Sequence, residues 1–309
     1  MATIQQSSPN SPAPVPAIQL TPELTRKRRS QGRIIFDRFV RNKAAVFGFV
    51  VLALLVLAAI FAPFIDHHDP DFYRVVLQDA PPSLAFPLGN DDLGRDELAR
   101  MLYGARVSLL VGVTAMVVQL VIGVTVGAMA GFLGGWVDNV LMRITDAFLA
   151  LPFLIALFVF GTLFSDGSVK AIVLIIAIFA WPNAARIVRG EFLSLKEREF
   201  LLAARTLGAG NLRLMFRHIL PNAVGPITVT ATLAVGANII AESILSFFSF
   251  GLQPPTSSWG TMLNDSQSFI ATDPLLVWAP GLAILITVLC FNLIGDGLRD
   301  AFDPHMTER

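Results

Sequence analysis

Long apolar stretches separated by short polar segments dominate the sequence between residues 44 and 294. Six of these stretches carry almost no charge, and each is long enough, or nearly so, to cross ~30 Å of hydrocarbon at ~1.5 Å per helical residue. The pattern therefore predicts an all-α integral membrane protein with six transmembrane helices. The predicted spans are residues 44–65, 107–132, 147–164, 171–185, 224–250 and 275–294.

Composition agrees with this pattern. Hydrophobic residues make up 54% of the 309 residues and charged residues only 15%, whereas a soluble domain carries about a quarter charged residues. The formal net charge is zero, so no overall attraction for nucleic acid is expected. The single cysteine, Cys290, lies inside an apolar run, which excludes a disulfide framework or a cysteine-based metal site within one chain.

Charge in the loops predicts the orientation. Residues 1–25 are rich in Ser, Pro, Ala and Gln and are predicted to be disordered. A basic block at residues 26–43 could suggest nucleic-acid binding, but its place directly before an apolar span favours a cytoplasmic flank. Of the 23 Lys and Arg residues, all but five fall on the side that this assignment makes cytoplasmic, so both termini are expected there. The exceptions are Arg74, Arg95, Arg100, Arg106 and Lys170.

The span 44–65 is too long for the apolar part of a signal peptide and lacks a clean cleavage pattern, so we expect an uncleaved first helix. The expected organisation has five parts. They are a disordered basic cytoplasmic tail (1–35), the first transmembrane helix with its basic flank (36–66), an external loop with an interfacial helix (67–104), a five-helix core with a cytoplasmic loop at 186–222 (105–300), and a cytoplasmic tail (301–309).

The cytoplasmic loop at 186–222 is the longest inner loop, and it is patterned. Apolar residues roughly share one helical face, and Gly208 is predicted to stop that helix because glycine adopts the left-handed conformation cheaply. The predicted face comprises Phe192, Leu195, Phe200, Ala203, Ala204 and Leu207; a second amphipathic piece comprises Leu212, Met215, Phe216 and Ile219. From the pattern alone, two interpretations stand: a helix lying on the membrane surface, or a helical hairpin that docks on a partner.

This loop resembles the cytoplasmic loop of binding-protein-dependent ABC importer permeases. The family pattern is Glu-Ala-Ala, three residues, Gly, nine residues, then Ile-x-Leu-Pro, and this chain has Ala203, Ala204, Gly208 and Leu220-Pro221 at the matching spacing. It departs in having Leu202 at the Glu position and His218 at the Ile position. The missing Glu puts in doubt any ion pair made by that residue elsewhere in the family.

The resemblance extends over residues 36–304, and it is closest to the C-type permeases of dipeptide and oligopeptide systems. Four blocks occur in the expected order, which is far more specific than one motif. They are LGNDDLGRDELARMLYGAR (88–106), GGWVDNVLMRITDAFLALP (134–152), GLQPPTSSWGTML (251–263) and PGLAILITVLCFNLIGDGLRDAFDP (280–304).

The resemblance implies a type I ABC importer permease fold in a bacterial or archaeal inner membrane. It also implies a second homologous permease subunit, two cytoplasmic ATPase subunits and an external solute-binding protein. In that arrangement the coupling contact to the ATPase involves Ala203, Ala204 and Gly208, with Arg205 and Leu207 as secondary candidates. The chain contains no Gly-Lys dipeptide and hence no P-loop, so ATP hydrolysis is expected in another chain. No cofactor, catalytic residue or metal site is expected in this chain.

Glu242 is the one acid within the predicted fifth span. Buried acids in membranes usually face a cavity or a partner, which makes Glu242 a candidate for contact with substrate. The alternative, which we favour at this point, places it near the outer water interface or at a helix break before Ser243.

Two further polar clusters lie in the predicted external loop. Asp91, Asp92 and Asp96 lack the spacing of a calcium loop, and we expect a turn followed by an interfacial helix over residues 94–103, capped by Asp92. His67 and His68, flanked by Asp66 and Asp69, could bind a transition metal weakly. A solvated loop without metal is the interpretation preferred here.

Three classes of function can be weighed against the sequence. The resemblance favours the ABC importer permease, whose relatives carry dipeptides, oligopeptides, glutathione, opines, sugars or nickel. A proton-coupled secondary transporter using Glu242 would be expected to show internal repeats and several buried charges. A membrane-embedded enzyme would need convergent catalytic side chains, which the apolar spans lack.

Overall fold

The computed structural model describes residues 30–303, and the fold within this range is helical, with no strand. The main helices are α1 (Gln31–Arg41), α2 (Lys43–Ile60), α3 (Ala62–Ile65), α4 (Glu97–Leu133), α5 (Gly135–Ala150), α6 (Phe153–Phe164), α7 (Val169–Lys196), α8 (Glu199–Thr206), α9 (Asn211–Arg213), α10 (Leu220–Asn222), α11 (Val224–Phe247), α12 (Trp259–Asp265) and α13 (Leu275–Phe302). A π-helical segment, Leu214–Ile219, joins α9 to α10.

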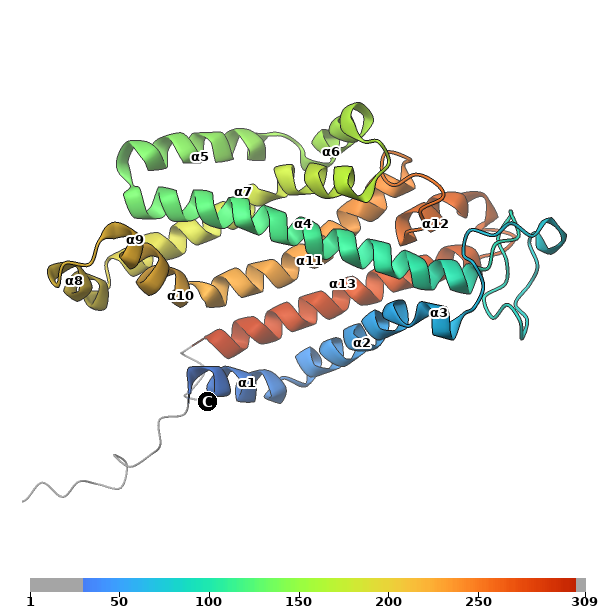
Figure 1. Ribbon diagram of the computed structural model, residues 1–309, viewed down its shortest axis with the longest axis horizontal. Coiled ribbons are helices and arrows are strands. Elements are labelled where there is room, and N and C mark those ends of the chain that lie inside the picture. Colours follow the sequence, from blue (N-terminus) through green and yellow to red (C-terminus); the bar gives the residue numbers. More distant parts are fainter. Residues whose placement is uncertain (1–29, 304–309) are drawn as a thin grey trace, which may run out of the picture.

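Within residues 30–303, five helices are long and apolar enough to cross a membrane: α2, α4, α7, α11 and α13. The pair α5 and α6 makes a sixth candidate span, bent by 84°. The long helices run roughly along one direction, and α8 to α10 lie at one end while α12 and the loop after α3 lie at the other (Figure 1). The start of α1 and the end of α13 lie at the α8 end, as expected for an even number of crossings.

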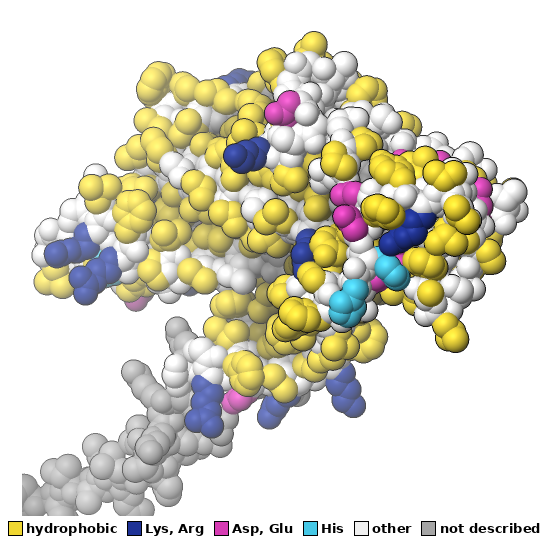
Figure 2. Space-filling view, turned by 45° about the vertical axis from the view of Figure 1, so that its right-hand side comes forward, with side chains coloured by type: hydrophobic (Ala, Val, Ile, Leu, Met, Phe, Trp, Pro, Cys, Tyr) yellow, Lys and Arg dark blue, Asp and Glu magenta, His cyan; other side chains and the backbone are white. Residues whose placement is uncertain are grey.

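Hydrophobic side chains cover much of the outer surface (Figure 2). On α2, for example, Phe47, Phe49 and Leu54 are exposed, which is the pattern expected of a helix that faces lipid. The predicted all-α, membrane-spanning class is therefore confirmed.

Small residues set the closest helix packing in the core. Gly123, Gly127 and Gly131 recur at four-residue intervals along one face of α4, against α7. A Cβ atom built at Gly123 would lie 2.7 Å from the Cβ of Ala184, and one at Gly131 would lie 2.7 Å from the Cβ of Phe192. The two backbones can approach this closely only because these positions carry no side chain, a common arrangement of packed membrane helices.

Several predicted boundaries are corrected by the structure. Residues 31–35 belong to α1 rather than to a disordered tail, whose remaining residues, 1–29, lie outside the described range. Helix α7 continues to Lys196, so the first part of the segment predicted as the cytoplasmic loop is a continuation of this helix. Helix α13 runs on to Phe302, past the predicted start of the C-terminal tail at 301; residues 304–309 are outside the described range.

The predicted interfacial helix over 94–103 is not a separate element, because α4 runs without a break from Glu97 to Leu133. Asp96, not Asp92, caps it: Asp96 Oδ1 accepts the backbone N–H groups of Leu98 and Ala99. Asp91 explains the later start. Its carboxylate accepts the N–H groups of Leu93 and Arg95, and Gly94 has φ of +72°, so residues 91–95 form a turn that is not part of a right-handed helix.

The predicted third span is also two helices rather than one. Pro152 provides no backbone N–H, and the residue before a proline is pushed out of the helical region, so Leu151 is extended, with ψ of 129°. Helix α6 then leaves α5 at a large angle. Pro182 and Pro280, by contrast, lie inside α7 and α13, which continue past them.

Candidate functional site

The turn at Gly208 has the geometry predicted for the end of the cytoplasmic helix. Gly208 has φ of +85°. Its N–H donates to the carbonyl of Arg205, and the N–H of Ala209 donates to the carbonyl of Ala204. These two bonds form a Schellman motif, which satisfies the last carbonyls of α8 and requires a left-handed residue at this position.

Helix α8 is held to the body through one face only. Leu201 is buried with Leu214 and Ile219 in an apolar cluster against the ends of α4 and α7. Ala204 is half-buried against this cluster, whereas Ala203, Arg205, Leu207 and Gly208 are exposed. Leu207, at the end of α8, has 88% of its surface exposed.

The predicted apolar face of the loop is therefore not one surface. Phe192 belongs to α7 and is buried, while Phe200 and Leu207 point outward from α8. The chain turns between α7 and α8, so one helical period cannot run through both. In the second amphipathic piece Ile219 is buried, but Leu212 and Phe216 are exposed. The result is a group of exposed apolar side chains at the tip of the molecule.

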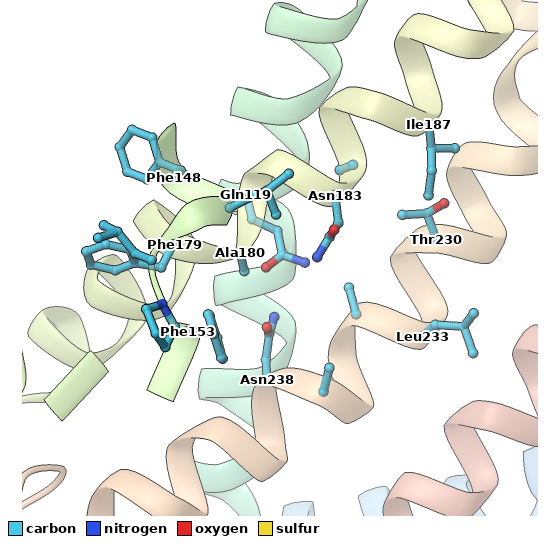
Figure 3. Close-up of a pocket in the computed structure, with 16 residues that line it drawn as sticks. Gln119, Phe148, Phe153, Phe179, Ala180, Asn183, Ile187, Thr230, Leu233 and Asn238 are labelled. Atoms are coloured by element: carbon cyan, nitrogen blue, oxygen red, sulfur yellow. The ribbon is translucent and has the colours of Figure 1, made fainter. Parts of the chain in front are cut away.

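A cavity of about 700 Å³ lies between α4, the α5–α6 junction, α7 and α11. Its wall is mostly apolar, with Phe148, Phe153 and Phe179 on one side. Three carboxamide side chains, Gln119, Asn183 and Asn238, come from three different helices and point into it (Figure 3). None of its lining residues carries a charge.

The cavity is open on one side. Gln119 and Asn238 are buried, but Asn183, Ile187 and Leu233 are exposed at its rim. Gln119 Oε1 is buried and has no hydrogen-bond partner among the described residues, and Asn238 donates to the carbonyl of Gly112 at 3.3 Å. The cavity thus offers unused hydrogen-bonding capacity near the middle of α4, α7 and α11. A second surface is needed to close it.

Glu242 lies outside this cavity. Its side chain is fully buried, and its carboxylate accepts hydrogen bonds from Ser108 at 3.1 Å, Ser246 at 2.8 Å and Ser258 at 2.7 Å. These hydroxyls belong to α4, α11 and the cap of α12. The expected break before Ser243 is wrong because α11 continues to Phe247. The geometry shows Glu242 joining three helices.

Comparison with known families assigns most of the chain. Residues 123–308 match the family described as the inner membrane component of binding-protein-dependent transport systems. Residues 30–84 match the N-terminal transmembrane domain of oligopeptide transport permease C.

The chain belongs to this permease family. It is 41% identical over 284 residues to the oligopeptide transport system permease protein OppC of Bacillus subtilis (strain 168), covering 92% of this chain and 93% of that one. It is 40% identical to the dipeptide transport system permease protein DppC of Alkalihalophilus pseudofirmus, over 90% and 91% of the two chains. It is 38% identical to the di/tripeptide transport system permease protein DppC of Pseudomonas aeruginosa, over 88% and 91%. The resemblance stated from the sequence blocks is confirmed.

The permease also contains a buried ion cluster at the end opposite α8. Arg100 donates to Asp91 Oδ2 and to Asp265 Oδ2, both at 2.7 Å, and Arg95 donates to the same two oxygens at 2.6 and 3.1 Å. Burial alone lowers the pKa of the Arg95 guanidinium, but the adjacent Asp91 and Asp265 carboxylates raise that pKa above its usual value. The cluster ties the start of α4 to the end of α12.

Sequence reasoning missed the cavity carboxamides and the ion cluster. Gln119, Asn183 and Asn238 are isolated polar residues in apolar helices, which is a recognisable signal because such residues usually face a cavity or another helix. The pairing of Arg100 with Asp265 had no comparable signal, since the two lie 165 residues apart.

Proposed function

We propose that this permease forms one half of the transmembrane pathway of an ATP-driven importer of dipeptides or oligopeptides. The open-sided cavity lined by carboxamides carries this proposal. A carboxamide both donates and accepts hydrogen bonds, so Gln119, Asn183 and Asn238 match the N–H and C=O groups shared by all peptides. Because no lining residue is charged, passage would depend little on the charge of the peptide side chains.

The second half of the pathway is a homologous permease subunit that closes the open side of the cavity. An external solute-binding protein delivers the peptide. Two cytoplasmic ATPase subunits close on ATP binding and drive alternating access. The named relatives, which are peptide permeases of about the same length, support this assembly. The chain itself would hydrolyse no ATP and bind no nucleic acid.

The α8–Gly208 turn is the proposed contact with the ATPase. Its exposed apolar tip is what a partner's groove would cover, and its rigid attachment through Leu201 would transmit ATPase closure to α4 and α7. The alternative proton-coupled transporter finds less support, because Glu242 is enclosed by three serines and does not line the cavity.

Orientation can be tested by cysteine labelling in a Cys290→Ser background. Leu84, Gln253 and Leu207 are all exposed. With both termini in the cytoplasm, Leu84→Cys and Gln253→Cys should react with a membrane-impermeant maleimide in intact cells. Leu207→Cys should react only after lysis. Labelling of Leu207→Cys in intact cells would place the proposed ATPase contact on the wrong side and end the proposal.

The pathway can be tested at Asn183, whose side chain reaches the cavity from its exposed rim. Because Asn183 is exposed, its replacement should leave few buried polar groups without a hydrogen-bond partner. In proteoliposomes holding the full complex, Asn183→Leu should lower the rate of ATP-dependent peptide uptake by up to ~10-fold. This is the effect expected from losing one hydrogen bond to the peptide, which contributes about 0.5–1.5 kcal/mol. Asn183→Gln keeps the carboxamide and should retain most uptake. Receptor-stimulated ATP hydrolysis should change little in either variant, and equal uptake by wild type and Asn183→Leu would argue against the cavity as the pathway.

A further inference from the structure

A compact group of three ligand-type side chains lies where the loop between α3 and α4 begins and ends. Asp66 directly follows α3, His68 is two residues later, and Asp96 caps α4. His68 Nδ1 is 2.9 Å from Asp66 Oδ1 and 2.7 Å from Asp96 Oδ2. One ligand atom from each residue lies within 4.8 Å of the other two. The fold therefore brings together, at one point, residues from the two ends of a long loop.

The two carboxylates are buried and fixed in place. Asp96 has no exposed surface, and its Oδ1 is held by the first N–H groups of α4. Asp66 is 7% exposed, and its Oδ1 accepts the backbone N–H of His68. These bonds orient both carboxylates toward the imidazole, and a tetrahedral ion with bonds of ~2.0–2.1 Å would move the three ligand atoms apart to roughly 3.3 Å.

The remaining atoms of this group have only one another as partners among the described residues. Asp96 Oδ2 and His68 Nδ1 are both buried, and neither has a hydrogen bond among the described residues, although they face each other at ion-pair distance. A single Nδ1–H must be shared between the two carboxylates, so neither receives a full hydrogen bond. Buried polar atoms without partners are uncommon and call for an explanation. A bound cation would satisfy Oδ2 and Nδ1 together.

The His68 ring is positioned by its neighbours. It stacks on Phe86, with ring centroids 4.9 Å apart. The side chain of His68 remains 35% exposed, although its Nδ1 atom is buried. Histidine side chains are visible at the surface of this end of the molecule (Figure 2). The adjacent His67 is exposed and takes no part in the group.

We propose that Asp66, His68 and Asp96 bind one divalent first-row transition-metal ion, of which Zn²⁺ fits best. A neutral imidazole nitrogen with two carboxylate oxygens is a usual zinc donor set, and its two negative charges balance the ion. Three protein ligands leave a fourth position for water on the exposed side. Ca²⁺ and Mg²⁺ fit less well because they prefer six or more oxygen ligands. The ion clips the end of α3 to the start of α4 and so fixes the base of the 66–96 loop.

This site is independent of the proposed transport activity and can be tested without it. The full chain, with any polyhistidine tag removed and metal stripped by a chelator, would be titrated with Zn²⁺ in detergent by calorimetry. We expect one Zn²⁺ per chain at this site, unaffected by millimolar Mg²⁺. His68→Ala should weaken binding at least ~100-fold, beyond the 10–100-fold typical of changes in outer-shell residues around metal ligands. His67→Ala, one residue away, should bind like wild type.

Two further measurements keep the test decisive. Asp66→Asn retains the acceptor for the His68 N–H but removes a charge, and it should also weaken Zn²⁺ binding. Size-exclusion profiles of the metal-free variants should match metal-free wild type, which rules out misfolding as the cause. Absence of saturable Zn²⁺ binding in the wild type would overturn the proposal. The proposal would also be overturned if His67→Ala and His68→Ala weakened Zn²⁺ binding equally, or if the wild type bound Ca²⁺ as tightly as Zn²⁺.

Discussion

Replacing Leu207 with Asp is expected to abolish ATP-driven peptide uptake while leaving the permease folded. Leu207 lies at the tip of α8 with 88% of its surface exposed, so a charge there meets water and costs the isolated subunit little. In the assembled importer the same side chain would be buried against the ATPase. An unpaired carboxylate in that contact would cost several kcal/mol, enough to separate hydrolysis from transport.

A matched control exists at the opposite end of the molecule. Leu84, in the 66–96 loop, is also fully exposed, and Leu84→Asp makes the same chemical change away from the proposed contact. Co-purification with the ATPases, receptor-stimulated hydrolysis and uptake in proteoliposomes should all be normal in Leu84→Asp. If Leu207→Asp were normal in all three assays as well, α8 would be a surface helix with no coupling role.

Gly208 tests the same contact through the backbone. No heavy atom lies within 4 Å of a Cβ atom built there, so crowding cannot explain the effect of a substitution. Gly208→Val should nevertheless impair coupling, because a β-branched residue at φ of +85° is strained by on the order of 1–3 kcal/mol. Gly208→Asn should be tolerated, since Asn adopts this conformation more readily. Equal behaviour of the two variants would show that the conformation of the turn is unimportant.

Ala204 needs a different interpretation from the one its sequence position suggests. Its side chain is half-buried against the apolar cluster that attaches α8 to the body. A charge at Ala204 would therefore disturb the packing that attaches α8 to the rest of the molecule, rather than the exposed contact surface. Leu207 and Ala203 are the better probes of the contact itself.

The features that could be predicted from the sequence are those that depend on the local pattern of residues. Apolar runs located the membrane helices, and the spacing around Gly208 predicted a left-handed turn that the structure confirms. Local pattern could not predict that α4 begins at Glu97, capped by Asp96, because that start depends on how Asp91 folds the preceding turn. Nor did the predicted apolar face separate α7 from α8, because it joined Leu195 to Phe200 across the charged residues 196–199 that form the turn between the two helices. Hydrophobic periodicity describes an isolated helix, and these features depend on contacts outside it.

The functional groups of the cavity and of the 66–96 loop are harder still to predict. The sequence groups Asp66 and His68 with their neighbour His67, but their partner in space is Asp96, which no local spacing indicates. Glu242 shows the reverse: as the one acid in an apolar helix it suggests a transport role, yet three serines enclose it. In both cases the tertiary partners, rather than the residue type, determine which function the side chain can have.

Replacing Arg100 with Leu is expected to destabilise the permease more than any surface substitution. The Arg100 side chain is 3% exposed and donates to Asp91 and Asp265, so its loss leaves these two carboxylates facing only Arg95. Removing one partner of a buried ion pair typically costs about 3–5 kcal/mol. The apparent Tm in detergent should fall by on the order of 10 °C. Arg143→Leu, at an exposed position on α5, should leave the Tm unchanged.

A double variant distinguishes charge from packing as the cause. Arg100→Leu with Asp265→Leu removes one arginine and one carboxylate, leaving Arg95 paired with Asp91 at 2.6 Å. If unpaired charge causes the loss, the double variant should be more stable than Arg100→Leu alone, because replacing both members of a buried ion pair by apolar residues is often neutral or stabilising. A double variant no more stable than the single one would mean that Arg100 acts through packing between α4 and α12. Thermal unfolding followed by size-exclusion chromatography, applied to the wild type, both single variants and the double variant, measures this coupling directly.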